Sequence, residues 1–180
     1  MVPDKLTNKK SKAGGTTSKR TIDEALPVAN APKIHHRGSK AKQPVILSYA
    51  ADKSESNMTA LEKMQLARTG ISKQDLEQLK QTTGLDYDSL AKGLAVTKAT
   101  LFSKKGEEKF SPDLSERIVS LADIYSYGYA VFEDVERFNT WMHRPNGALG
   151  GQAPYAIIDN QFGREEIKDL IGRIEYGVYS

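Results

Sequence analysis

The segment Leu90–Leu101, with the sequence LAKGLAVTKATL, decides how the middle of this chain folds. Ala91 is small enough to lie where two helices cross closely. Thr97 is a good N-cap for a second helix, which leaves the first side chains of that helix free to enter a DNA major groove. The apolar wedge that sets the angle between the two helices consists of Leu94, Val96 and Leu101. The pattern predicts a helix-turn-helix.

In that geometry one set of side chains faces outward from the second helix. These candidate DNA-binding residues are Thr97, Lys98, Ala99, Phe102, Ser103, Lys104 and Lys105. Lys98 can reach a guanine, Phe102 can contact a thymine methyl group, and the last two lysines are placed for phosphates. Two features depart from the usual pattern. Ala95 stands where the turn commonly has Gly, and the outward face lacks Arg, Asn and Gln, the usual base readers. The alternative is a helical hairpin that only packs, with Phe102 inside.

The residues before this segment also show helical spacing. Apolar residues from position 57 onward predict a helix that Gly70 closes. Ser72, with Asp75 three residues later, predicts a capped helix that ends at Gly84. Either Asp86 or Asp88 can cap the helix that follows.

Two further apolar stripes follow the predicted helix-turn-helix. Ser111-Pro112 begins a long helix, and Pro at the first helical position fits such a start. The stripe of this helix, interpreted as a core or dimer face, comprises Leu114, Ile118, Leu121, Ala122, Tyr125 and Tyr129. We expect Gly128 to bend or end the helix. A second stripe then comprises Val131, Val135, Phe138, Trp141 and Met142, and it ends in a turn at Pro145.

The glycine-rich stretch 147–151 suggests a phosphate loop, but it has neither of the usual glycine spacings and no strand precedes it. The simpler interpretation is a turn in which the glycines adopt positive φ and Leu149 fills the core. Pro154 begins a short helix, and Asn160 caps the last one. Gly177 is a natural C-terminal stop for that helix. Together these elements predict an all-α fold.

Charge is distributed unevenly along the chain. Residues 1–44 contain ten Lys or Arg and three Asp or Glu, a balance of +7, whereas the whole chain carries +3 and the remainder therefore −4. A basic arm on a mildly acidic body suits attachment to phosphates, and a solvated tail that only aids solubility is the alternative. The run Val45–Tyr49 is strand-like. Two alternatives stand equally: it packs on the body or on a partner chain, or it joins a sheet.

Composition excludes several classes of protein. The chain has no Cys, which excludes disulfides and thiolate metal sites and fits a reducing cytoplasm. No apolar run approaches the roughly 18 residues that span a bilayer, and residues 1–20 lack the hydrophobic stretch of a secretory signal. His35-His36 is only a weak metal signal. No catalytic constellation is evident, so we expect a cytoplasmic protein that is not an enzyme and needs no cofactor.

The segment from about Gly70 to Ser180 resembles the Xre/MbcA/ParS-type antitoxins of bacterial toxin–antitoxin pairs. The helix-turn-helix is the less specific part of the likeness. The more specific part is a string of Trp, Pro-Asn, Leu-Gly-Gly, Pro, Gly and Tyr-Gly-Val at the C-terminal end. Its residues are Trp141, Pro145-Asn146, Ala148-Leu149-Gly150-Gly151, Pro154, Gly163 and Arg173–Val178.

The resemblance implies an Xre-like helix-turn-helix domain, a small helical toxin-binding domain and, usually, a homodimer. It implies a partner toxin of the RES type, which consumes NAD, and repression of the antitoxin's own operator DNA. The expected parts are a basic, mostly irregular N-terminal arm at 1–56, a DNA-binding and dimerisation domain at 57–127, and a toxin-binding domain at 128–180. The expected toxin-binding residues, which include the chain end as a plug, are Trp141, Arg173, Tyr176, Gly177, Val178, Tyr179 and Ser180. The alternative is a stand-alone dimeric transcription regulator.

Overall fold

The computed structural model describes residues 46–47 and 53–178, and its regular elements are helices. They are α1 (Ala60–Thr69), α2 (Lys73–Thr83), α3 (Tyr87–Gly93), α4 (Lys98–Phe102), α5 (Pro112–Phe132), α6 (Val135–His143) and α7 (Gln161–Glu175), with the short 3-10 turns η2 (Glu55–Asn57), η3 (Gly147–Leu149) and η4 (Pro154–Ile157). Within these ranges, extended pairing is limited to one isolated bridge between Ser72 and Lys109. The predicted all-α fold is confirmed.

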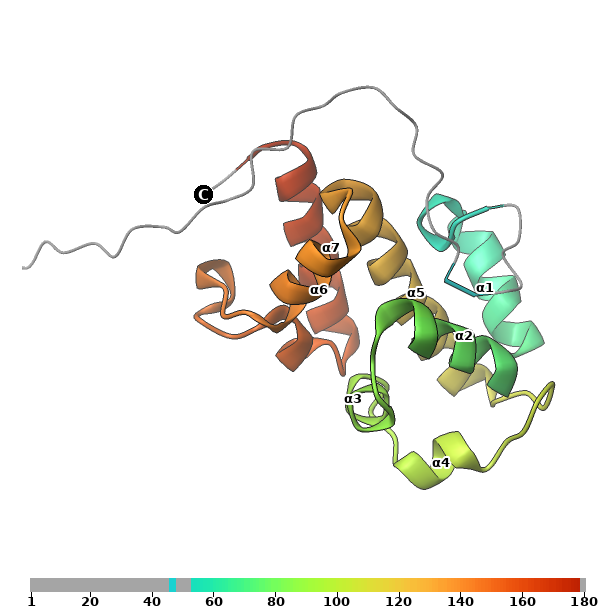
Figure 1. Ribbon diagram of the computed structural model, residues 1–180. Helices are drawn as coiled ribbons and strands as arrows, with labels where there is room; N and C mark the ends of the chain where they lie inside the picture. The colour runs from blue at the N-terminus through green and yellow to red at the C-terminus, as the bar shows by residue number, and fades with distance from the viewer. Residues whose placement is uncertain (1–45, 48–52, 179–180) are drawn as a thin grey trace, which may run out of the picture. The chain divides into compact units, whose positions relative to one another are not determined.

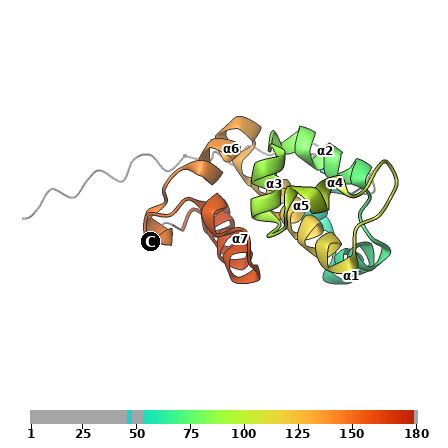
Figure 2. The ribbon, with the colours of Figure 1, turned by 90° about the horizontal axis from the view of Figure 1, so that it is seen from below.

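The long helix α5 is the element around which the others pack. It contacts α1, α2, α6 and α7, and both views place α1 and α7 on opposite sides of it (Figure 1, Figure 2). Its predicted stripe is buried, including Tyr125 and Tyr129, while Tyr127 between them is only partly buried. The hydroxyl of Tyr127 donates to Glu175 at the end of α7. A stripe this deeply buried forms the core of one chain.

The helix ends follow local sequence signals. Ser72 and Asp75 form the predicted reciprocal capping box of α2. Gly70 and Gly84 close α1 and α2 with φ of +87° and +71°, values that Gly adopts at little cost. Of the two candidates for the cap of α3, Asp86 takes the role, because its side chain accepts from the N–H of Ser89.

Gly128 was predicted to bend or end the helix, and it does not end α5. The helix continues to Phe132, and Gly128 lies at its contact with α6. A Cβ atom placed on Gly128 would be 2.1 Å from Cε2 of Phe138. The residue therefore makes room for an aromatic ring. The expected boundary between 127 and 128 falls inside a continuous helix.

Two other apolar residues are more exposed than the sequence predicted. Val135 is 43% exposed because it is the first residue of α6, before that helix reaches the core at Phe138. Leu149 is partly exposed and does not fill the core. Its loop closes on its own backbone, since the N–H of Asn146 donates to the carbonyl of Gln152 and that of Gly151 to the carbonyl of Asn146. The positive φ expected of Gly150 and Gly151 is present.

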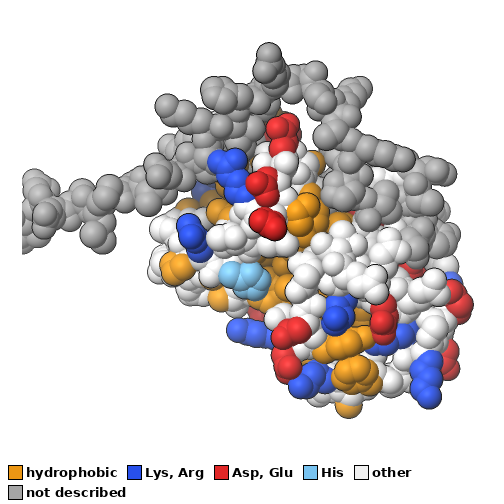
Figure 3. All heavy atoms as spheres, in the orientation of Figure 1, with side chains coloured by type: hydrophobic (Ala, Val, Ile, Leu, Met, Phe, Trp, Pro, Cys, Tyr) orange, Lys and Arg blue, Asp and Glu red, His pale blue; other side chains and the backbone are white. Residues whose placement is uncertain are grey.

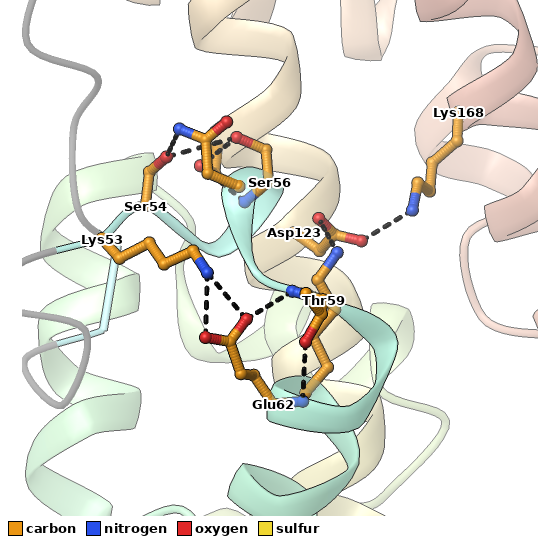
Figure 4. A network of polar contacts seen from close by, with 10 residues as sticks. Lys53, Ser54, Ser56, Thr59, Glu62, Asp123 and Lys168 are labelled. Atoms are coloured by element: carbon orange, nitrogen blue, oxygen red, sulfur yellow. Dashed lines mark hydrogen bonds and ion pairs between the residues drawn. The ribbon is translucent and has the colours of Figure 1, made fainter.

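A buried carboxylate links the two sides of α5. Asp123 forms ion pairs with Lys63 of α1 at 2.8 Å and with Lys168 of α7 at 2.7 Å (Figure 4). Nearby, the carboxylate of Glu55 accepts the backbone N–H groups of Ile46 and Leu47, which are both fully buried. These two residues pack on the body, which is one of the alternatives predicted, and the rest of the run 45–49 lies outside the described residues.

Candidate functional site

Helices α3 and α4 form the predicted helix-turn-helix. Leu94 and Leu101 are fully buried between the helices, and the side chain of Thr97 caps α4 by accepting from the N–H of Thr100. Ala95, at the turn position that commonly has Gly, adopts φ of +52°. Arg117 of α5 supports this turn, because its guanidinium donates to the carbonyl of Leu94 at 3.1 Å.

Most of the candidate DNA-binding residues share one exposed surface, named here the α4 face. Thr97, Lys98, Ala99, Phe102, Ser103 and Lys105 are exposed, and Lys104 is partly buried. The side chain of Phe102 is 54% exposed. The alternative hairpin, with Phe102 inside, is therefore wrong on this point.

Phe102 belongs to a small cluster of aromatic and charged side chains. Its ring lies 4.5 Å from the ring of Tyr87, measured between centroids. The ammonium of Lys73 lies 4.3 Å from the centroid of Tyr87 and 5.2 Å from that of Phe102. The hydroxyl of Tyr87 donates to Glu77, whose pKa is lowered chiefly by this hydrogen bond. The cluster holds Phe102 in place although the ring faces solvent.

Lys98 and the hydroxyl groups of the α4 face already have partners within the chain. Lys98 forms an ion pair with Asp88 at 2.7 Å, and this hydrogen bond raises the pKa of Lys98. The hydroxyls of Thr97 and Thr100 lie 3.0 Å apart. The hydroxyl of Ser103 donates to the carbonyl of Thr100. Asp88 was predicted only as a candidate helix cap, so its ion pair with Lys98 was not predicted from the sequence.

The loop after α4 carries both cations and anions. The N–H of Lys105 donates to Glu108, and the N–H of Gln74 donates to the carbonyl of Gly106, which ties the loop to the start of α2. Residues 72–110 contain seven Lys and six Asp or Glu. Figure 3 shows hydrophobic side chains reaching the surface around α3 and α4 between basic and acidic ones. The surface near α4 is thus close to neutral.

The second group of predicted residues lies at the end of α7. Gly177 has φ of +67°, and the N–H of Val178 donates to the carbonyl of Arg173, which closes the helix as predicted. Tyr176 is 79% exposed and Val178 is 58% exposed. Arg173 is half exposed and forms an ion pair with Glu166 at 3.2 Å. Tyr179 and Ser180 lie outside the described residues.

Trp141, another of the predicted toxin-binding residues, belongs to α6 and packs among aromatic rings. It is partly buried, with its ring centroid 5.4 Å from that of Phe132 and 5.7 Å from that of Phe138. Gly163, which belongs with Trp141 to the C-terminal residues that carry the family resemblance, is also a packing residue. A Cβ atom there would be 1.7 Å from the carbonyl oxygen of Ile157.

An exposed aromatic residue escaped the sequence prediction. Phe162, the second residue of α7, is 81% exposed. Positions 162, 166, 169, 173 and 176 recur at steps of three and four, so Phe162 and Tyr176 mark the two ends of one helix face. The sequence prediction addressed only the buried face of α7. The repeat of positions on the exposed face is the signal that could have identified Phe162.

Neither a metal centre nor a membrane span is found within the described ranges. No group of three or more His, Cys, Asp and Glu side chains there is arranged to hold a metal ion. No described helix is both long and apolar enough to cross a bilayer. His143, the last residue of α6, instead contacts the ring of Tyr155.

Comparisons with known proteins match the two segments of the chain that carry these residues. The model of the antitoxin Xre-like helix-turn-helix domain matches residues 62–123, and that of the antitoxin Xre/MbcA/ParS C-terminal toxin-binding domain matches residues 128–177. An antitoxin Xre from Photorhabdus laumondii is 34% identical over 76 residues, which are 42% of this chain and 51% of that protein. An antitoxin Xre from Yersinia enterocolitica is 36% identical over 73 residues, 40% of this chain and 49% of that protein. The chain thus spans about half the length of the curated relatives it matches.

Proposed function

The chain belongs to the Xre/MbcA/ParS family of antitoxins, and from this premise we propose that it neutralises a partner toxin with its C-terminal domain and binds operator DNA with its helix-turn-helix. The toxin is of the RES type and consumes NAD. The antitoxin acts as a non-enzymatic homodimer that represses its own operon.

The proposed inhibition is steric. Tyr176 and Val178 are exposed and placed directly after a well-anchored helix, and Tyr179 and Ser180 follow them in the sequence. Exposed aromatic residues of this kind provide much contact area at low entropic cost. In the proposed complex they enter the opening of the toxin's active site.

The anchoring of α7 supports this arrangement. Tyr127 of α5 donates to Glu175, and Lys168 of α7 pairs with the buried Asp123. These contacts hold the middle and the last turn of α7 against α5, so the plug is presented without further ordering of the helix. The exposure of Tyr176 at this fixed helix end is the observation that carries the proposal.

Deletion of residues 178–180 tests the plug. We expect the shortened chain to lose inhibition of NAD consumption by the toxin while its helices melt at an unchanged temperature. Phe102→Ala is the control, because it removes an exposed aromatic side chain from the helix-turn-helix and leaves α7 unchanged. Full inhibition by the shortened chain would reject the plug.

For DNA, the observation that favours binding is the exposed α4 face on a closed helix-turn-helix. Lys104 and Lys105 are proposed to contact phosphates. Replacing both with Ala should weaken binding of the operator uniformly across sequences and reduce the salt dependence by about one unit of slope per lost contact. An unchanged gel shift and salt slope would remove this assignment.

A further inference from the structure

We propose that the α4 face recognises thymine in the major groove through its C5-methyl group, and that Phe102 is the residue that reads it. This inference rests on the proposed DNA binding and deepens it by naming the base. It differs from the polar readout that a surface lysine such as Lys98 suggests.

The first support is that Lys98 and the hydroxyl groups of this face, the polar side chains beside Phe102, already have partners within the chain. Lys98 is paired with Asp88, the hydroxyls of Thr97 and Thr100 face each other, and that of Ser103 donates to a backbone carbonyl. DNA could draw Lys98 away, since exposed ion pairs are weak. Asp88 would then be left unpaired beside the phosphates, which repel it. A reading of guanine by Lys98 therefore carries an electrostatic cost.

The second support is the apolar surface that remains. Ala99 and Phe102 are exposed on α4 and stand three residues apart, so they are neighbours on one side of the helix. The ring of Phe102 is exposed on one side and packed on the other. Tyr87 packs against it at 4.5 Å, and the ammonium of Lys73 lies 5.2 Å from its centroid. The exposed edge of the ring is thus fixed before DNA arrives.

The chemistry of the groove decides which base this surface fits. Among the four bases, thymine alone presents a methyl group in the major groove, and apolar side chains are its natural contacts. The near-neutral balance of charge around α4, with seven Lys and six acidic residues over 72–110, leaves a larger share of discrimination to such contacts. The geometry therefore points to A·T pairs opposite Phe102.

Uracil tests the proposal, because it pairs like thymine but lacks the methyl group. A duplex is first selected from a randomised library of about 20 base pairs with the full chain, so that no operator needs to be known. Each thymine of the selected duplex is then replaced by deoxyuridine, one position at a time, and Kd is measured. At a contacted position we expect about fourfold weaker binding, which corresponds to the ~0.8 kcal/mol of burying one methyl-sized group.

Variants of the chain assign the effect to one side chain. In Phe102→Ala the penalty for uracil should disappear, and Phe102→Leu, which keeps an apolar group, should retain part of it. Lys105→Ala is the control, since it should weaken both duplexes by the same factor. Phe102 and Lys105 are both exposed, so all three variants are compatible with folding, and thermal unfolding checks this.

Three results would overturn the proposal in distinguishable ways. Equal binding of thymine and uracil at every position would remove methyl recognition while leaving DNA binding intact. A penalty that persists in Phe102→Ala would assign the reading to another residue. Failure of the full chain to select any duplex would reject the proposed DNA binding together with the inference that rests on it.

Discussion

Replacing Gly128 with Ala should destabilise this protein, although the same change inside an unconstrained helix stabilises it by about 1 kcal/mol. The reason is the contact between α5 and α6. The added Cβ atom would be 2.1 Å from Cε2 and 2.2 Å from Cζ of Phe138, whose side chain is fully buried. Either the ring of Phe138 or the backbone of α5 must therefore shift, and the fully buried ring has little freedom to do so.

The magnitude follows from the surroundings of that ring. Phe138 packs edge-on against Tyr125, Tyr129 and Phe132, with centroid separations of 5.3–5.4 Å. Overpacking a site of this kind costs about 1–3 kcal/mol. After the gain of about 1 kcal/mol in helix propensity is subtracted, a net loss of up to about 2 kcal/mol remains. At about 2–4 °C per kcal/mol for a chain of this size, Tm should fall by several degrees.

The assay is thermal and urea unfolding of Gly128→Ala beside Gly172→Ala. Gly172 also lies inside a helix, but its nearest neighbour would be the hydroxyl of Tyr127 at 3.4 Å, an ordinary contact. The control should therefore be stabilised by up to about 1 kcal/mol. Phe138→Leu should relieve part of the loss when combined with Gly128→Ala. Equal stabilisation by both Gly→Ala changes would refute the account of the α5–α6 contact.

Two further predictions concern local geometry and pH. Ala95→Gly should stabilise the helix-turn-helix by about 0.5–1 kcal/mol, because Ala95 has φ of +52° and left-handed backbone costs about 1–2 kcal/mol for residues other than Gly; a lower urea midpoint would contradict this. The pKa of Glu62 is lowered to about 2, first by its hydrogen bond to Lys53 and then by that to the backbone of Thr59. A lowered carboxyl pKa stabilises the fold above the usual value of 4.5 and ceases to do so as the pH falls to about 2. The difference in Tm between the native chain and Glu62→Gln should therefore be largest near neutral pH and vanish in strong acid; a difference that is independent of pH would count against the pairing.

Signals confined to a few neighbouring residues could be predicted from the sequence. The capping box of Ser72 and Asp75, the cap at Thr97 and the stop at Gly177 depend on groups within one helical turn, so spacing alone identifies them. The wedge of the helix-turn-helix is predictable for the same reason. These signals placed the helices and the exposed α4 face in advance.

Contacts between distant segments could not be predicted in this way. Gly128 looks like a helix breaker until the ring of Phe138, ten residues later, is seen against it. Lys98 looks like a free base reader until Asp88, on the preceding helix, is seen to hold it. Phe162 is exposed and does not contribute to the core pattern from which α7 was predicted. Only the helical repeat that it shares with Tyr176 relates it to the exposed end of α7.

The most direct test of the account is co-expression of the chain with the product of the neighbouring gene, followed by purification and an assay of NAD consumption. The account predicts a stable complex in which NAD consumption is suppressed. It also predicts that NAD consumption recovers when the chain is removed by limited proteolysis. A neighbour that purifies alone and consumes NAD at the same rate with and without the chain would contradict the proposed antitoxin activity.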